Sequence, residues 1–178
     1  MYLSSPLFST AYGEKVFLID DARTMKAHEA EVKRILDILA YLVKTSDPDG
    51  LELYFTCSKQ HFKEKDPSKL VAKFMSNKPR GLTDIRTRLT SIIDGFIKGF
   101  DRNWFMKKLK PVRSLNIYVL TDGIWQPDTD LTPPIRRLVK KLDENGQYQV
   151  GIQFISFGNG AVALERLNEL DDDLEEKM

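Results

Sequence analysis

Residues 16–25 read VFLIDDARTM, and this stretch decides the fold. Its first four residues, Val16 to Ile19, form a continuous apolar run, which is typical of a strand buried on both faces of a parallel sheet. The run stops at Asp20 and Asp21, so two carboxylates follow the end of the strand. From residue 25 to residue 44 the apolar positions recur at helical spacing. A buried strand followed by an amphipathic helix therefore opens the chain.

The same alternation continues to the end of the sequence. Further strands are expected at residues 51–56, 115–120 and 150–157, an antiparallel edge strand near 58–65, and helices at 67–75, 83–100, 131–145 and 161–174. This order predicts an α/β fold, with a doubly wound, mostly parallel sheet and helices on both faces. We expect residues 1–13 to be a flexible arm and residues 14–178 to be one domain.

Composition excludes several classes of function. The 27 Lys and Arg against 26 Asp and Glu leave a net charge of +1, which gives no reason to expect nucleic acid or an anionic membrane as a partner. The single cysteine, Cys57, fits a reducing compartment, because no internal disulfide can form. Neither a signal peptide nor a membrane span is evident, so we expect a cytoplasmic protein.

Sheets of this kind bind ligands at the carboxyl ends of their strands. The polar residues expected at that edge are Asp20, Asp21, Thr83, Thr121 and Asp122. Neither glycine-rich phosphate loop, G-x-G-x-x-G or G-x-x-x-x-G-K-[ST], occurs, which argues against nucleotide binding by such a loop.

Two phosphoryl-transfer folds also place aspartates after the first strand. A receiver domain needs an aspartate where this chain has Phe55-Thr56-Cys57. A phosphatase of the haloacid dehalogenase type needs D-x-D-x-T, and Ala22 stands where its general acid/base belongs. A hydrolase or phosphotransferase that uses Asp20 and Asp122 remains an alternative from the enzyme class.

A third family fits better. The run VFLIDDARTM resembles the strand and loop that open a von Willebrand factor type A (vWA) domain, where D-x-S-x-S is usual. Residues 79–83 (PRGLT) and 87–89 (TRL) resemble its threonine-bearing loop and helix, and residues 117–123 (IYVLTDG) its fourth strand and closing aspartate. Residues 150–154 and 167–174 look like fungal versions. The resemblance runs from about residue 14 to the end, and implies a Rossmann-like protein-binding module with a protein partner, not an enzyme.

The resemblance also implies a metal-ion-dependent adhesion site. Its ligands fall on Asp20, Thr24, Thr83 and Asp122, and Mg²⁺ prefers about six oxygens in octahedral geometry. The first serine of the family motif falls on Ala22, which cannot coordinate. The site is therefore degenerate, and we expect Mg²⁺, Mn²⁺ or Ca²⁺ to bind weakly or not at all. A working site that binds an acidic residue of the partner is the alternative.

The residues around this site differ from the family as well. Arg23, Leu82 and Arg86 stand where small residues are usual. Our hypothesis is that the Arg23 guanidinium bridges Asp20 and Asp122, because two close carboxylates repel and need a cation.

The expected binding rim consists of Asp21, Arg23, Asp84, Arg86 and Trp125, with Trp125 as an aromatic anchor. Plainer roles remain open for some residues of the edge. Thr24 and Thr83 are also suited to cap the helices that they precede, and Asp21 to a structural turn. From the family we expect further chain after the acidic segment 171–177.

Overall fold

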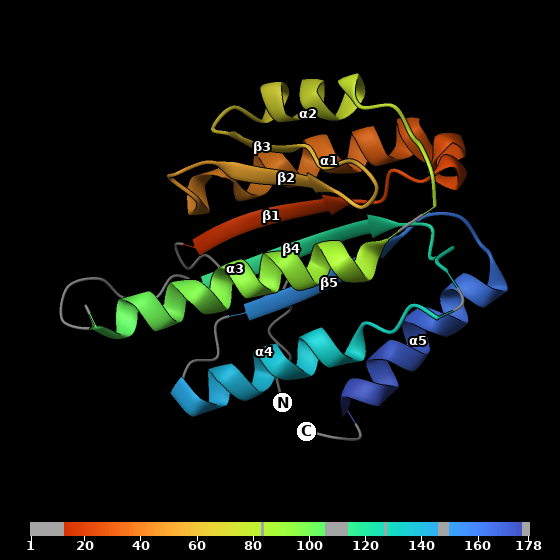
Figure 1. The fold of residues 1–178 in the computed structure, drawn as a ribbon. Helices are drawn as coiled ribbons and strands as arrows, with labels where there is room; N and C mark the ends of the chain where they lie inside the picture. The colour runs from red at the N-terminus through yellow and green to blue at the C-terminus, as the bar shows by residue number, and fades with distance from the viewer. Residues whose placement is uncertain (1–12, 83, 106–113, 127, 146–149, 176–178) are drawn as a thin grey trace, which may run out of the picture.

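The computed structural model describes residues 13–82, 84–105, 114–126, 128–145 and 150–175. In chain order the elements are β1 (Gly13–Ile19), a 3₁₀ helix η2 (Arg23–His28), α1 (Glu29–Val43), a 3₁₀ turn η3 (Lys44–Ser46), β2 (Leu51–Phe55), β3 (His61–Glu64), α2 (Pro67–Ser76), α3 (Ile85–Phe105), β4 (Ser114–Thr121), α4 (Thr132–Asn145), β5 (Val150–Ser156) and α5 (Ala161–Glu175). Figure 1 shows them as one sheet flanked by helices.

The five strands form one sheet in the order β3-β2-β1-β4-β5. Strand β1 pairs in parallel with β2 and β4, and β4 pairs in parallel with β5. Strand β3 is antiparallel to β2 and lies at the edge. The predicted fold class, a mostly parallel sheet with an antiparallel edge strand, is confirmed.

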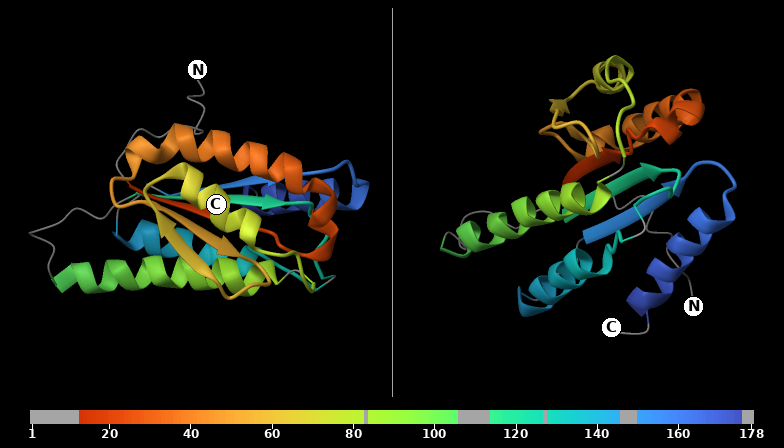
Figure 2. Two further views of the ribbon diagram at one scale, coloured as in Figure 1. Left: turned by 90° about the horizontal axis from the view of Figure 1, so that it is seen from above. Right: turned by 45° about the vertical axis from the view of Figure 1, so that its right-hand side comes forward.

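Helices cover both faces of the sheet, as Figures 1 and 2 show. Along β1, Phe17 and Ile19 point into the core beneath α1 and α2, whereas Val16 and Leu18 point into the core beneath α3, α4 and α5. Period-two alternation of a strand with both faces buried produces this division. It explains why the apolar run of β1 is continuous.

Several boundaries differ from those expected. The helix expected from residue 25 begins as the 3₁₀ helix η2, and α1 itself starts at Glu29. Helix α3, expected to end near residue 100, continues to Phe105, and residues 106–113 lie outside the described residues. The expected arm, except Gly13, which begins β1, also lies outside them. No helix in the described ranges has the length and apolar character needed to cross a membrane.

Strands β2 and β3 are added on one side of β1, and β4 and β5 on the other. The strand order therefore reverses between β1 and β4, which are neighbours although far apart in sequence. Just beyond the strands, the amide of Asp20 donates to the carbonyl of Leu120 at 2.8 Å, and the amide of Thr56 donates to that of Ile19 at 3.0 Å. The residues that follow β1, β2 and β4 therefore meet at one place, which we call the carboxyl edge. Ligands bind to sheets of this type at such a switch point.

Candidate functional site

Asp20 lies at the centre of the carboxyl edge and is only 1% exposed. Its Oδ1 accepts hydrogen bonds from the amide of Ala22 at 3.1 Å and from the hydroxyl of Thr56 at 3.2 Å. Its Oδ2 accepts from the hydroxyl of Thr121 at 2.8 Å. Neutral donors from three strand ends thus solvate both oxygens of this buried carboxylate, as burial of a charge requires.

Asp21 is a cross-link and not part of an exposed rim. Its side chain accepts from the amides of Cys57 at 2.6 Å and Ser58 at 3.2 Å, and from the side-chain amide of Asn77 at 2.9 Å. Its carbonyl accepts from the amide of Arg80 at 2.7 Å. The expected place on the binding rim is therefore wrong, because the residue is 3% exposed and ties the loop after β2 to the segment after α2.

Asp122 is buried, at 4% exposed, but its carboxylate is only half satisfied. Its Oδ1 accepts from the amide of Ile124 at 2.9 Å, in the same two-residue turn that Asp20 forms with Ala22. Its Oδ2 is buried and has no hydrogen-bond partner among the described residues. An unsatisfied buried carboxylate oxygen lowers stability unless a further donor or cation reaches it.

The hydroxyl of Thr121 joins this edge to the core. It donates to Asp20 and accepts from the amide of Gly123 at 3.0 Å and from the indole nitrogen of Trp125 at 2.9 Å. Trp125 is 7% exposed and packs in the core beneath α3 and α4. The expectation that it forms an exposed anchor is wrong, because its ring supports the loop after β4 from below.

The remaining predicted rim and metal residues lie on the outside of the edge. Arg23, Thr24, Asp84 and Arg86 are exposed, and Thr83 lies outside the described residues. Among the described residues, the carboxylates of Asp20 and Asp122 accept hydrogen bonds from backbone amides and threonine hydroxyls and form no ion pair with Arg23. The hypothesised guanidinium bridge is thus not present.

Helix capping at the edge also differs from expectation. The 3₁₀ helix η2 has Ala22 at its N-cap, so Thr24 lies within the helix. At α3 the cap is Asp84, whose carboxylate accepts from the amide of Thr87 at 3.1 Å. Aspartate is a strong N-cap residue, and its negative charge also interacts favourably with the positive end of the helix dipole.

Metal ligands at the carboxyl edge are few among the described residues. Within the described ranges, no three His, Cys, Asp or Glu side chains lie close enough together to hold a metal ion. The methyl group of Ala22 is buried where the family has a hydroxyl, and both oxygens of Asp20 already accept hydrogen bonds. Mg²⁺ needs about six oxygen ligands, and among the described carboxylates of this edge the Oδ2 atom of Asp122 is one oxygen that accepts no hydrogen bond and could coordinate an ion.

Sequence reasoning missed three residues that build the site: Thr56, Ser58 and Asn77. Thr56 could have been found by the same argument as Asp20, because it directly follows a buried strand. Asn77 ends α2, which carries no sequence signal for this role, and only the tertiary fold brings it to Asp21.

Cys57 lies beside the site, where its thiol is half-buried. Its thiol donates to the carbonyl of Leu82 at 3.2 Å. Burial raises the pKa of this thiol to about 11, and the nearby carboxylates of Asp21 and Asp20 act in the same direction. The reactive thiolate is therefore scarce at neutral pH.

Comparison with solved structures agrees with this architecture. The TFIIH p34 N-terminal domain superposes with a TM-score of 0.54 at 11% identity, over 92% of this chain and 89% of that one. That domain has a vWA-like fold. The fold of this chain is thus vWA-like.

A second similar structure is proximal thread matrix protein 1 from the mussel byssus. It superposes with a TM-score of 0.57 at 16% identity, over 88% of this chain. The chain spans 41% of that protein. No family model and no curated protein matches the sequence. The shared property is therefore the fold.

Proposed function

We propose that this vWA-like domain is a protein–protein interaction module that binds its partner through the carboxyl edge, with weak or no dependence on a divalent metal. One observation carries the proposal. The carboxylates of Asp20 and Asp21 accept hydrogen bonds that hold the edge loops together, including one from Thr121 to Asp20 and one from Asn77 to Asp21. The loops are therefore fixed in place by the protein's own donors.

The same hydrogen bonds argue against an enzyme. A carboxylate that acts as nucleophile or general base needs an oxygen within reach of the substrate. Of the two carboxylates that such an enzyme would use, Asp20 is 1% exposed with both oxygens accepting, and Asp122 is 4% exposed. We therefore place the hydrolase and phosphotransferase alternatives below binding.

The Oδ2 atom of Asp122 favours a second candidate within the binding class. This buried oxygen has no partner, so a divalent ion at the edge would find one free carboxylate oxygen there. In that case the ion binds weakly and recruits an acidic side chain of the partner, with Thr83 and waters as further ligands.

Two narrower expectations belong to the same proposal. A cytoplasmic location rests on Cys57, the single cysteine of the sequence. The likeness to fungal versions rests on residues 150–154 and 167–174.

An affinity-capture experiment tests the proposed function. Wild type and Leu82→Glu, which changes an exposed side chain of the edge, are used as baits in excess Mg²⁺ and in excess EDTA. Partners that are retained in EDTA and lost from Leu82→Glu support the proposal. Capture that is identical for both baits shows that the edge is not the binding surface, and release of all partners by EDTA shows that a metal is required.

A further inference from the structure

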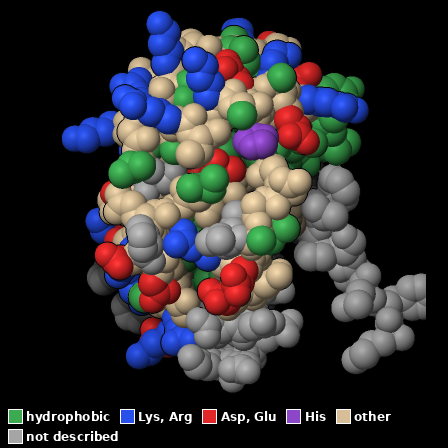
Figure 3. Space-filling model, turned by 90° about the vertical axis from the view of Figure 1, so that its right-hand side faces the viewer, with side chains coloured by type: hydrophobic (Ala, Val, Ile, Leu, Met, Phe, Trp, Pro, Cys, Tyr) green, Lys and Arg blue, Asp and Glu red, His purple; other side chains and the backbone are tan. Residues whose placement is uncertain are grey.

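The carboxyl edge carries a set of positively charged side chains that we call the cationic rim: Arg23, Lys26, Lys78, Arg80 and Arg86. All of them are exposed. None forms an ion pair with another described residue, whereas elsewhere Lys63 pairs with Glu52 at 3.0 Å and Arg137 pairs with Asp94. Figure 3 views this edge directly and shows Lys and Arg side chains gathered on its upper half.

The cations stay unpaired because the acids of the edge are engaged below them. Asp20, Asp21 and Asp122 are at most 4% exposed and accept hydrogen bonds from neutral donors. The exposed Asp84 caps α3 through the amide of Thr87. The five rim cations therefore lie at the surface above buried carboxylates, while the acidic Glu29 lines the cavity beside Asp20, Asp21 and Pro79.

The loop that bears much of the rim is fixed in position. Between α2 and α3, the amide of Arg80 donates to the carbonyl of Asp21 at 2.7 Å, and the carbonyl of Leu82 accepts from the thiol of Cys57 at 3.2 Å. Gly81 between them has a φ of 69°, which disfavours other residues. In Figure 1 this segment runs down from α2 to α3 past the ends of the strands. A surface ordered in advance loses little entropy when a partner binds.

Apolar side chains stand among these charges. Leu82 is 73% exposed, the most of any large hydrophobic residue in the described part of the chain, and Met75 near the end of α2 is 43% exposed. Across the edge, Ile124 in the loop after β4 is 55% exposed. Exposed leucine flanked by arginine and lysine is a surface for a ligand that has both aliphatic and anionic groups.

We infer, resting on the proposed function, that the partner segment is an acidic peptide with an aliphatic side chain that packs on Leu82. Its carboxylates pair with the rim, above all with the two-pronged guanidinium groups of Arg80 and Arg86. Recognition of the acidic partner thus comes from the protein's own cations and needs no metal ion.

A peptide fits this surface better than a polyphosphate or a lipid headgroup does. The positive charge of this face is confined to a few rim side chains, because the chain as a whole carries a net charge of only +1, which suits a short acidic segment better than a long polyanion. The buried carboxylates beneath the rim oppose dense phosphate charge, and Leu82 with Ile124 offers contacts that a phosphate backbone does not use.

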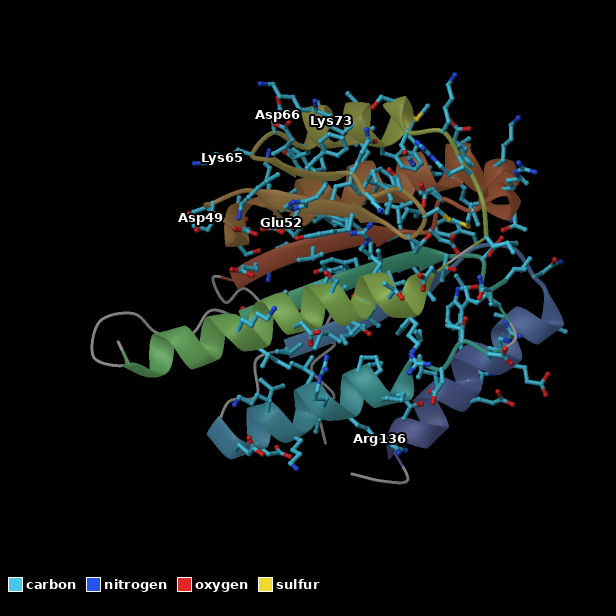
Figure 4. All side chains as sticks on the ribbon, in the orientation of Figure 1. Asp49, Glu52, Lys65, Asp66, Lys73 and Arg136 are labelled. Atoms are coloured by element: carbon cyan, nitrogen blue, oxygen red, sulfur yellow. The ribbon has the colours of Figure 1, made fainter. Side chains whose placement is uncertain are left out.

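The test is a titration of the isotopically labelled domain with two synthetic peptides, in EDTA, followed by amide chemical shifts. One peptide alternates glutamate with leucine and the other alternates lysine with leucine. A variant with Lys78, Arg80 and Arg86 changed to glutamate reverses three charges of the rim. Its control carries Lys65→Glu, which is exposed at the opposite end of the sheet (Figure 4), and Lys69→Glu, which is exposed on α2.

The glutamate peptide should shift residues 23–26 and 78–86 selectively, bind at least about tenfold more weakly to the rim variant, and weaken with added salt. The control variant should bind like wild type. The inference fails if both peptides bind equally, if the two variants lose the same affinity, or if single-stranded DNA or anionic vesicles displace the peptide. If partner capture still depends on Leu82 while charge reversal has no effect, the proposed function stands and this inference falls.

Discussion

Asp21 and Asn77 lie 56 positions apart in the chain, and the side-chain amide of Asn77 donates a 2.9 Å hydrogen bond to the carboxylate of Asp21. The same carboxylate accepts from the amides of Cys57 and Ser58. One buried side chain therefore fixes the loop after β2 and the segment after α2. The loops of the carboxyl edge depend on it.

Replacing Asp21 with asparagine should lower the free energy of unfolding by about 2–4 kcal/mol, because the new amide group faces donors in place of a charged acceptor. Asn77→Ala removes one donor and should cost about 1–2 kcal/mol. Chemical denaturation measures both. Asp128→Asn, at an exposed position, is the matched control and should change stability by less than about 0.5 kcal/mol. Equal effects at residues 21 and 128 would contradict the cross-linking role.

The sequence predicted the backbone of this edge better than its side-chain partners. Asp20 and Asp122 could be placed because each follows a run of buried strand residues, and strands of a parallel sheet end at a common edge. The edge strand near residues 58–65 was also correct, and it is observed as His61–Glu64. These inferences depend only on local periodicity and on the order of elements.

The contacts that each side chain makes could not be predicted in the same way. Arg23 was expected to pair with Asp20, but the carboxylate of Asp20 instead accepts hydrogen bonds from the neutral hydroxyl groups of Thr56 and Thr121, and Arg23 is exposed. Trp125 was expected at the surface, but its indole donates to Thr121 inside the core. Such choices depend on distances between segments that are remote in sequence, which a single sequence does not contain.

Asp122→Asn tests whether the unpaired oxygen of Asp122 holds a cation. The asparagine carbonyl still accepts from the amide of Ile124, and the uncompensated negative charge is lost. Without a metal, stability should stay unchanged or rise by about 1 kcal/mol. Thermal unfolding in Mg²⁺ and in EDTA measures this. A melting temperature that Mg²⁺ raises in wild type and not in the variant would establish a bound ion and overturn the metal-free interpretation.

Ala22→Ser should restore part of the lost metal site. Ala22 is 3% exposed and its amide already donates to Asp20, so a hydroxyl at this position is added next to that carboxylate. The affinity of the domain for a divalent cation should rise by about tenfold or more, and tenfold is equivalent to about 1.4 kcal/mol of binding free energy. Calorimetric titration with Mg²⁺ and Mn²⁺ measures it, with Ala27→Ser as the control at an exposed position. No gain over wild type would show that the missing hydroxyl is not what weakens the site.

Cys57 should alkylate slowly in the folded domain. Its pKa lies at about 11 against an ordinary value of 9.0, so at pH 8 the folded thiol should react about 100-fold more slowly than the denatured one. The folded state binds the proton more tightly, so the stabilising contribution of this group is complete below pH 9.0 and is lost as the pH rises through about 11. Rates with iodoacetamide across this pH range give the pKa. A midpoint near 9.0 in the folded domain would contradict the buried thiol.

The central claim is that the carboxyl edge binds a protein without a metal ion. Its most direct measurement is the amount of partner retained by wild type and by Leu82→Glu in excess EDTA, with Lys65→Glu as a control far from the edge. The account predicts that wild type and Lys65→Glu retain the same partners and that Leu82→Glu loses them. Retention by all three baits, or loss from all three when EDTA replaces Mg²⁺, would contradict it.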